Sequence, residues 1–216
     1  MKPATAPIPA NETKRLKVLW QYQVLDTIPE EVFDDLTELA ARICEAPIAM
    51  ITLVDEDRQW FKSKVGVSIN ETSRDISFCG HAINHSDLFI VPDASKDERF
   101  AQNPLVISEP KIRFYAGAPL ITPDGYTLGT LCVIDKISRD LRPDQKQALR
   151  VLARHVMSQL ELRRRSHELS YAHKEREQIR KDLKTARAEL ALVRRQLRVS
   201  KSKKPPRPTA KKKSRK

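Results

Sequence analysis

The stretch from Asp75 to Ile83, D-I-S-F-C-G-H-A-I, holds residue types that can do chemistry, because it sets the thiol of Cys79 two residues before the imidazole of His81. A nucleophile and its general base must approach within about 3 Å. Residues i and i+2 lie roughly 6.5–7 Å apart on a strand and point about 200° apart on a helix. We therefore predict that Cys79 and His81 line a pocket or pack in a core, and we predict no catalytic residue.

Neither metal nor phosphate chemistry is indicated by the sequence. A metal site needs at least three protein ligands, and the candidates near Cys79 show no ligand-like spacing: His85, Asp93, Cys132 and Asp135. The chain contains neither G-x-G-x-x-G nor a P-loop. We predict no metal site, and the sequence leaves the identity of any small-molecule cofactor unknown.

The three cysteines, at positions 44, 79 and 132, cannot all pair and are too few for a secreted disulfide scaffold. Alternation in L-G-T-L-C-V-I puts Cys132 on one strand face with Thr130 and Ile134, where a free cysteine packs as a small hydrophobe. The N-terminal residues lack the apolar stretch of a signal peptide, and no apolar run approaches the ~20 residues that span a bilayer. We expect a cytoplasmic protein without a transmembrane segment.

The order of apolar patterns predicts an α+β fold. Apolar residues at three- and four-residue spacing predict helices after Asn11 and around Val32–Ile43. Short β-branched or aromatic runs predict strands, and T-P-D-G predicts a tight turn between the last two. These strands are Ile48–Val54, Gln59–Val65, Leu88–Val91, Phe114–Ile121 and Tyr126–Ile134.

A long helix is predicted from Pro143 to about Ser200, because no Gly or Pro falls between residues 144 and 200. Alternating steps of four and three define a heptad seam, whose members are Ile179, Leu183, Ala186, Leu190, Val193 and Leu197. A helix that is polar on its other sides must bury such a stripe on a partner. We expect a homodimer, preferably with parallel helices; a helix folded back on the body is the alternative.

Charge divides the chain in two. Residues 1–160 carry a net charge of −3, and residues 161–216 carry +15. The segment 201–216 contains nine Lys and Arg and no acid, which predicts a disordered basic tail. Such a tail could bind nucleic acid without base specificity or an anionic membrane, or it could serve only as a solubilising tail or a docking strip for an acidic protein.

Six blocks in this order resemble the GAF domain at the N-terminus of many bacterial sensor histidine kinases and diguanylate cyclases. The blocks are L-D-T-I-P-E-E-V-F-D-D-L-T-E-L-A-A, I-A-M-I-T-L-V-D-E-D-R-Q-W-F-K-S-K-V-G, D-I-S-F-C-G-H-A-I, V-P-D-A-S-K-D-E-R-F-A-Q-N-P-L-V, I-R-F-Y-A-G-A-P-L and L-G-T-L-C-V-I-D. The resemblance covers roughly residues 12–160. It implies an antiparallel sheet with helices on one side and a ligand-sized pocket on the other.

The resemblance also implies a function. GAF domains bind small molecules or tetrapyrroles, or only dimerise, and they regulate more often than they catalyse. A helix leaving the domain passes the signal to an output module such as a kinase. No kinase, cyclase or ATPase module is legible here, so we predict a non-catalytic sensor of a small ligand or a redox signal, relaying through a dimeric helix to a partner. Bilin-carrying relatives place a cysteine directly before a histidine, and the intervening Gly80 argues against a covalent bilin.

Two other functions stay open at this point. One is a GAF-type thiol enzyme that reduces oxidised methionine with Cys79 or Cys132. The other is a nucleic-acid-binding accessory protein in which the GAF fold only dimerises. The expected organisation is an arm (1–11), a sensory domain (12–160), a coiled-coil helix (161–200) and a tail (201–216).

Several further residues are candidates for the pocket. Trp60 and Phe61 could cap an apolar ligand or pack under the second helix. Asp93 could bind a ligand or cap a turn. Arg113 and Tyr115 could present a cation and a phenol to an anionic ligand, and Arg113 could instead pair with Asp97 or Glu98. The full predicted set is Trp60, Phe61, Phe78, Cys79, His81, Asp93, Arg113, Tyr115 and Cys132.

Overall fold

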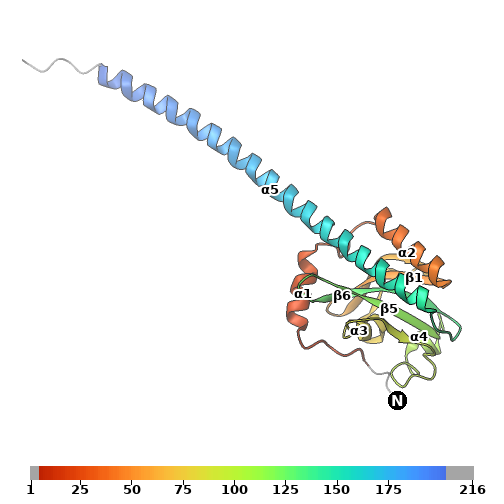
Figure 1. The fold of residues 1–216 in the computed structure, drawn as a ribbon. Coiled ribbons are helices and arrows are strands. Elements are labelled where there is room, and N and C mark those ends of the chain that lie inside the picture. Colours follow the sequence, from red (N-terminus) through yellow and green to blue (C-terminus); the bar gives the residue numbers. More distant parts are fainter. Residues whose placement is uncertain (1–4, 203–216) are drawn as a thin grey trace, which may run out of the picture. The chain divides into compact units, whose positions relative to one another are not determined.

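A computed structural model describes residues 5–202 of the chain. Contacts divide the chain into two units, residues 1–166 and residues 167–216, which are described separately. The first unit is built on one six-stranded antiparallel sheet in the order β3-β2-β1-β6-β5-β4 (Figure 1). Its strands are β1 (Ile48–Val54), β2 (Arg58–Val65), β3 (Glu71–Ser73), β4 (Phe89–Val91), β5 (Phe114–Ile121) and β6 (Thr127–Asp135). This is the α+β architecture that the sequence predicts.

The two faces of the sheet are covered by different helices (Figure 1). On one face lie α1 (Glu12–Gln21), α2 (Glu31–Cys44) and the first part of α5 (Pro143–Ser202). On the other face lie α3 (Phe78–Ala82), α4 (Pro104–Ile107), the 3-10 turn η1 (Arg74–Ile76) and long loops. Each face has its own apolar core, which we call the helix-face core and the loop-face core.

The central strands form where the sequence is apolar without interruption. Every residue of β1 is buried, because this strand is covered on both faces. Strands β5 and β6 form a hairpin closed by Thr122–Gly125, and Gly125 adopts φ +83°, a conformation that glycine tolerates. In β6 the side chains alternate: Leu131 and Val133 enter the helix-face core, whereas Cys132 and Ile134 enter the loop-face core.

The helix α5 begins at Pro143, as predicted, and continues to Ser202. Within the first unit it buries Leu149, Leu152, Val156 and Leu160 in the helix-face core. In the second unit the side chains from His167 to Arg195 are exposed, including the large apolar residues Leu169, Ile179, Leu183, Leu190 and Val193. The Leu197 side chain and the tail from residue 203 onward lie outside what the structure describes. No helix in the described part of the chain is long and apolar enough to cross a membrane.

Candidate functional site

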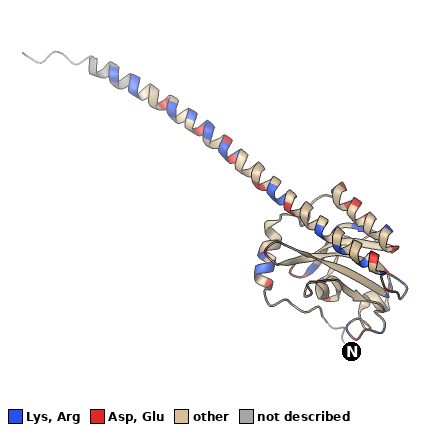
Figure 2. Cartoon of the chain, viewed as in Figure 1, with Lys and Arg blue, Asp and Glu red and all other residues tan. Residues whose placement is uncertain are grey.

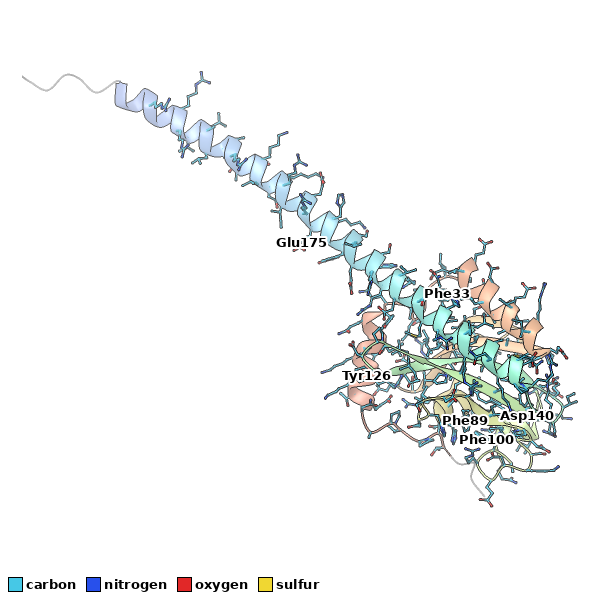
Figure 3. All side chains as sticks on the ribbon, viewed as in Figure 1. Phe33, Phe89, Phe100, Tyr126, Asp140 and Glu175 are labelled. Atoms are coloured by element: carbon cyan, nitrogen blue, oxygen red, sulfur yellow. The ribbon has the colours of Figure 1, made fainter. Side chains whose placement is uncertain are left out.

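Aromatic rings fill much of the loop-face core. Phe78, at the start of α3, stacks on Phe100 with ring centroids 4.0 Å apart and on Tyr115 of β5 at 5.2 Å. Phe89 of β4 lies edge-on to Phe100 at 6.2 Å, and Figure 3 shows these two phenylalanines together near β5. A ring system of this kind holds α3 against the sheet, since such pairs add stability beyond their buried area.

A cluster of thiols and hydroxyls lies where α3 meets strands β5 and β6. The Cys79 sulfur accepts hydrogen bonds from the Tyr115 hydroxyl at 3.2 Å and from the Thr130 hydroxyl at 3.1 Å. The Cys132 sulfur is 3.8 Å from the Cys79 sulfur. The Thr52 hydroxyl continues the cluster, 3.2 Å from that of Thr130. We call these five residues the thiol–hydroxyl cluster; all of them are buried.

The surroundings of the two thiols set their acidity apart. Burial raises the pKa of the Cys79 thiol, but hydrogen bonds from Cys132 and from neighbouring hydroxyl groups together lower it to about 7. In the structure the Cys79 thiol donates to the Cys132 sulfur; when Cys79 ionises, the Cys132 thiol becomes the donor between the two sulfurs. Donation to Cys79 and burial raise the pKa of Cys132 well above that of an ordinary thiol. Cys79 is therefore the sulfur that ionises first.

Local backbone features position the cluster. The Ser77 hydroxyl accepts a hydrogen bond from the Gly80 amide at 2.9 Å and so caps the first turn of α3. The amide group of Asn103 donates to the Ile76 carbonyl at 2.9 Å, which ties the α4 segment to the same turn. On β5, a Cβ at Gly117 would overlap the phenol ring of Tyr115. Glycine at position 117 thus makes room for the phenol that donates to Cys79.

A small apolar cavity of about 60 Å³ lies beside the cluster. Its lining residues are Ile48, Met50, Gln59, Phe61, Val67, Ile69, Phe78, Cys79, Leu105, Pro110, Ile112, Tyr115 and Ile134. This volume suits a few atoms at most, since one water occupies about 30 Å³ of liquid. Gln59 Oε1 is buried and has no hydrogen-bond partner within the described chain. It is therefore a polar anchor at the wall of an otherwise apolar space.

Four of the predicted site residues line this cavity: Phe61, Phe78, Cys79 and Tyr115. Cys132 is not in the cavity wall but contacts Cys79 in the cluster. His81 packs edge-on against Phe100, with ring centroids 4.7 Å apart, and, two residues from Cys79 on α3, it points to a different side of that helix. Trp60 belongs to the helix-face core and points away from the cavity.

The two remaining predicted residues fix loops. Asp93 accepts hydrogen bonds from the backbone amide and the hydroxyl of Ser95, at 3.1 and 2.6 Å, and caps a turn. Arg113 donates to the carbonyl oxygens of Val106 and Ile112, each at 3.0 Å. The ion pair considered for it with Asp97 is not formed, because Arg99 pairs with Asp97 at 2.6 Å.

Sequence reasoning missed most of the apolar lining. Met50 and Ile48 lie on β1 opposite Cys132 and Ile134 of β6, so strand alternation could have placed them in the cavity wall. Pro110 and Ile112 come from a loop and carried no comparable signal. Among the described residues, no group of three or more potential ligands could hold a metal ion.

Comparison with known proteins identifies the domain family. A model of the GAF domain family matches residues 29–160. The protein named "Cyclic di-GMP phosphodiesterase PA2567" from Pseudomonas aeruginosa is 42% identical over 158 residues, which are 73% of this chain. The chain spans 27% of the length of that relative.

Solved structures show the same fold at low identity. The GAF domain of an Acinetobacter phosphoenolpyruvate-protein phosphotransferase has a TM-score of 0.53 and 18% identity, covering 71% of this chain and 94% of that one. The GAF domain region of a Geobacter sulfurreducens membrane protein has a TM-score of 0.51 and 20% identity, covering 71% and 99%. Because the family model spans more than half of the residues, the chain belongs to the GAF domain family.

Proposed function

We propose that this chain is a sensory module that receives a small ligand in the loop-face cavity and relays its presence through a dimeric helix α5. A signalling sensor role agrees with the GAF family. The observation that carries the ligand proposal is the apolar cavity bounded by Cys79 and by the unpartnered Gln59 oxygen. Since the cavity holds about 60 Å³, the ligand is small or displaces the loop of Pro110 and Ile112.

Strand β6 is the route by which an occupant would reach α5. Ile134 faces the cavity, and the adjacent residue Val133 enters the core that also contains Leu149 and Val156 of α5. A ligand that displaces Ile134 would therefore also displace Val133, its neighbour on the helix side of β6. Packed cores respond to such shifts by repacking, because they contain few voids.

The module is proposed as non-catalytic. The relative from Pseudomonas aeruginosa is named a phosphodiesterase, but this chain matches about a quarter of its length. The output partner proposed here is a signalling protein, a kinase or a cyclic-dinucleotide enzyme, that receives the helix. Binding of a polyanion by residues 201–216 stays a prediction.

The test is native mass spectrometry of the purified chain, which reports dimer mass and any retained small molecule together. Val67, half-buried at the cavity wall, offers a blocking variant, Val67→Phe. Val65→Phe is the matched control, because Val65 packs against the helix-face core. Loss of the retained molecule in Val67→Phe alone supports the proposal. Retention in both variants contradicts it.

A second candidate is a redox sensor, favoured by the 3.8 Å separation of the Cys79 and Cys132 sulfurs. The Cys79 thiolate would attack one oxygen of hydrogen peroxide, break the O–O bond and release hydroxide. The Cys132 sulfur would then attack the sulfenic sulfur and release water, leaving a disulfide. The thiols lose two electrons and the peroxide gains them. The sulfurs must close to about 2.05 Å.

Peroxide treatment followed by mass analysis of peptides tests this candidate. If the chain is a redox sensor, peroxide treatment should produce a Cys79–Cys132 disulfide in the native chain. In Cys132→Ser it should produce a sulfenic acid on Cys79 that dimedone traps. Two intact thiols after a treatment that oxidises exposed cysteines would exclude the redox candidate and leave the ligand proposal standing. The same two thiols could also reduce methionine sulfoxide, which is the enzymatic alternative. Catalytic turnover of methionine sulfoxide would reveal that activity.

A further inference from the structure

We infer that residues 167–195 of α5 pair with the same residues of a second copy of the chain as a parallel, in-register two-stranded coiled coil, whose direction is set by charge. The inference rests on the proposed dimeric relay and adds the orientation and the register. Its basis is the exposed helix from His167 to Arg195 and the arrangement of charges along that helix (Figure 2).

The apolar seam fixes the heptad positions. Leu169, Leu183 and Leu190 occupy a positions, and Ile179 and Val193 occupy d positions. These five side chains are between 49% and 71% exposed. A stripe of this kind on an otherwise polar helix requires a partner.

The positions that flank the seam are segregated by sign. Between His167 and Arg195 the g positions carry only acids, namely Glu168, Glu175, Asp182 and Glu189. The e positions carry only bases, namely His173, Arg180, Arg187 and Arg194. All eight side chains are exposed. This segregation of charge is a second observation, separate from the apolar seam. It indicates that the partner that buries the seam is a second copy of the same helix.

The two possible orientations have opposite electrostatics. In a parallel dimer each g residue meets the e residue five positions later on the partner. The resulting pairs are Glu168 with His173, Glu175 with Arg180, Asp182 with Arg187, and Glu189 with Arg194. In an antiparallel homodimer g meets g and e meets e, so acids face acids and arginines face arginines. The parallel arrangement turns every flanking contact into an attraction.

Arg176 interrupts the seam at an a position. In the parallel arrangement an a residue packs beside the preceding g residue of the partner, which places Arg176 next to Glu175 of the second copy. A polar residue at one a position fixes register, because any slip would set it against apolar layers. Exposed ion pairs each change an association constant by about a factor of two. By two-fold symmetry each pair forms twice, so eight attractive contacts in the parallel dimer stand against eight repulsive contacts in the antiparallel one, a difference of at least about 100-fold in the association constant.

Orientation is tested by a cysteine introduced at one end of the seam. Leu190→Cys should form a covalent dimer under mild oxidation, because position 190 faces position 190 only in the parallel register. Ala188→Cys, at an outer f position of the same turn, is the control and should stay uncrosslinked. A dimer by mass in which Leu190→Cys does not crosslink overturns the parallel register and leaves the dimeric sensor intact. A monomer at high concentration overturns both.

The role of charge is tested by a matched pair of triple variants of the full chain. The first variant places acids at three e positions, opposite the acidic g positions, through Arg180→Glu, Arg187→Glu and Arg194→Glu. It should weaken the dimer at least tenfold at low salt. Lys174→Glu, Lys181→Glu and Arg195→Glu change the net charge equally at f positions, and should leave the dissociation constant within about twofold. Equal weakening in both triple variants overturns the assigned pairs.

Discussion

At Cys79, burial and hydrogen bonding act in opposite directions on the thiol. The hydrogen bonds prevail and lower its pKa to about 7. Burial raises the pKa of Cys44 to about 11, so Cys79 should be the only cysteine that titrates from about pH 6 to about pH 8. We expect a single step in thiolate absorbance centred near pH 7, absent in Cys79→Ser. In Tyr115→Phe, which removes one donor, the step should move to higher pH.

The sign of the linked stability follows from the same shift. The pKa of Cys79 is lower in the folded chain than the ordinary value of 9.0. Its ionisation therefore stabilises the fold fully above about pH 9, and this contribution is lost as the pH falls through about 7. A thiolate step only above pH 9 would show that Cys79 is an ordinary buried thiol.

Glu12 is the second residue whose charge state should govern stability. It accepts hydrogen bonds from Arg15 at 2.7 Å and from Arg74 at 2.6 Å. Burial raises the pKa of Glu12, but these two guanidinium groups lower it to about 2. Its contribution to the free energy of unfolding is thus present above about pH 4.5 and lost as the pH falls toward 2.

The variant Glu12→Gln should lower the free energy of unfolding by about 3 kcal/mol at neutral pH, because it leaves two buried cations without their anion. The difference from the unmodified chain should shrink in urea titrations as the pH approaches 2. Glu38→Gln breaks an exposed pair with Arg42 and should cost only about 0.3 kcal/mol. Equal effects of the two substitutions would contradict a buried ionic role for Glu12.

Helix α5 has two roles, packing in the helix-face core and the proposed dimerisation. Substitutions at two leucines distinguish these roles. Leu149 is fully buried in the helix-face core, whereas Leu183 is 49% exposed in the second unit. Leu149→Ala should lower the free energy of unfolding by about 3 kcal/mol at any protein concentration, because it leaves a cavity. Leu183→Ala should act only through dimerisation. Urea unfolding at two protein concentrations distinguishes these effects, and a concentration-independent loss in Leu183→Ala would contradict the proposed seam.

Long elements could be predicted from the sequence, and short ones could not. Strands β1 and β5 lie at the expected residues, since each is an apolar run ended by polar or turn residues. The five-residue helix α3 was missed because F-C-G-H-A has no periodicity and contains a glycine. Its helical state depends on the Ser77 cap and on rings contributed by Phe100 and Tyr115, which are distant in sequence.

The same distinction applies to the site. Tyr115 and Phe61 were found because their residue types stand out within predicted strands, and Cys79 was found because its thiol lies two residues from an imidazole. The sequence did not show which of Trp60 and Phe61 faces the cavity. Adjacent strand residues face opposite sides of a sheet, and an irregularity between Ile51 and Thr52 shifts the pairing of β1 with β2. Nothing local indicated that the loop carrying Ile112 closes over the sheet.

For the whole molecule, the proposals join a cavity on one face of the sheet to a helix whose first part packs on the other. If occupancy or ionisation at Cys79 alters the dimer, thermodynamic linkage requires that dimerisation alter Cys79 by the same factor. The reciprocal effect can be measured without knowing the ligand, because the proton is a ligand of Cys79. Adjacent sheet residues such as Cys132 and Val133 face opposite sides and connect the two cores directly.

We therefore expect the dimer dissociation constant to change at least about fivefold from about pH 6 to about pH 8, the lower end of common coupling energies. In Cys79→Ala the change should be smaller. Both proteins carry the same histidines, including His173 beside the seam, so the difference between them isolates the thiol. Sedimentation equilibrium at each pH gives the constants. Identical pH dependence in the two proteins would show that the cavity and the helix are not coupled, and the chain would then be a dimer that happens to contain a cavity.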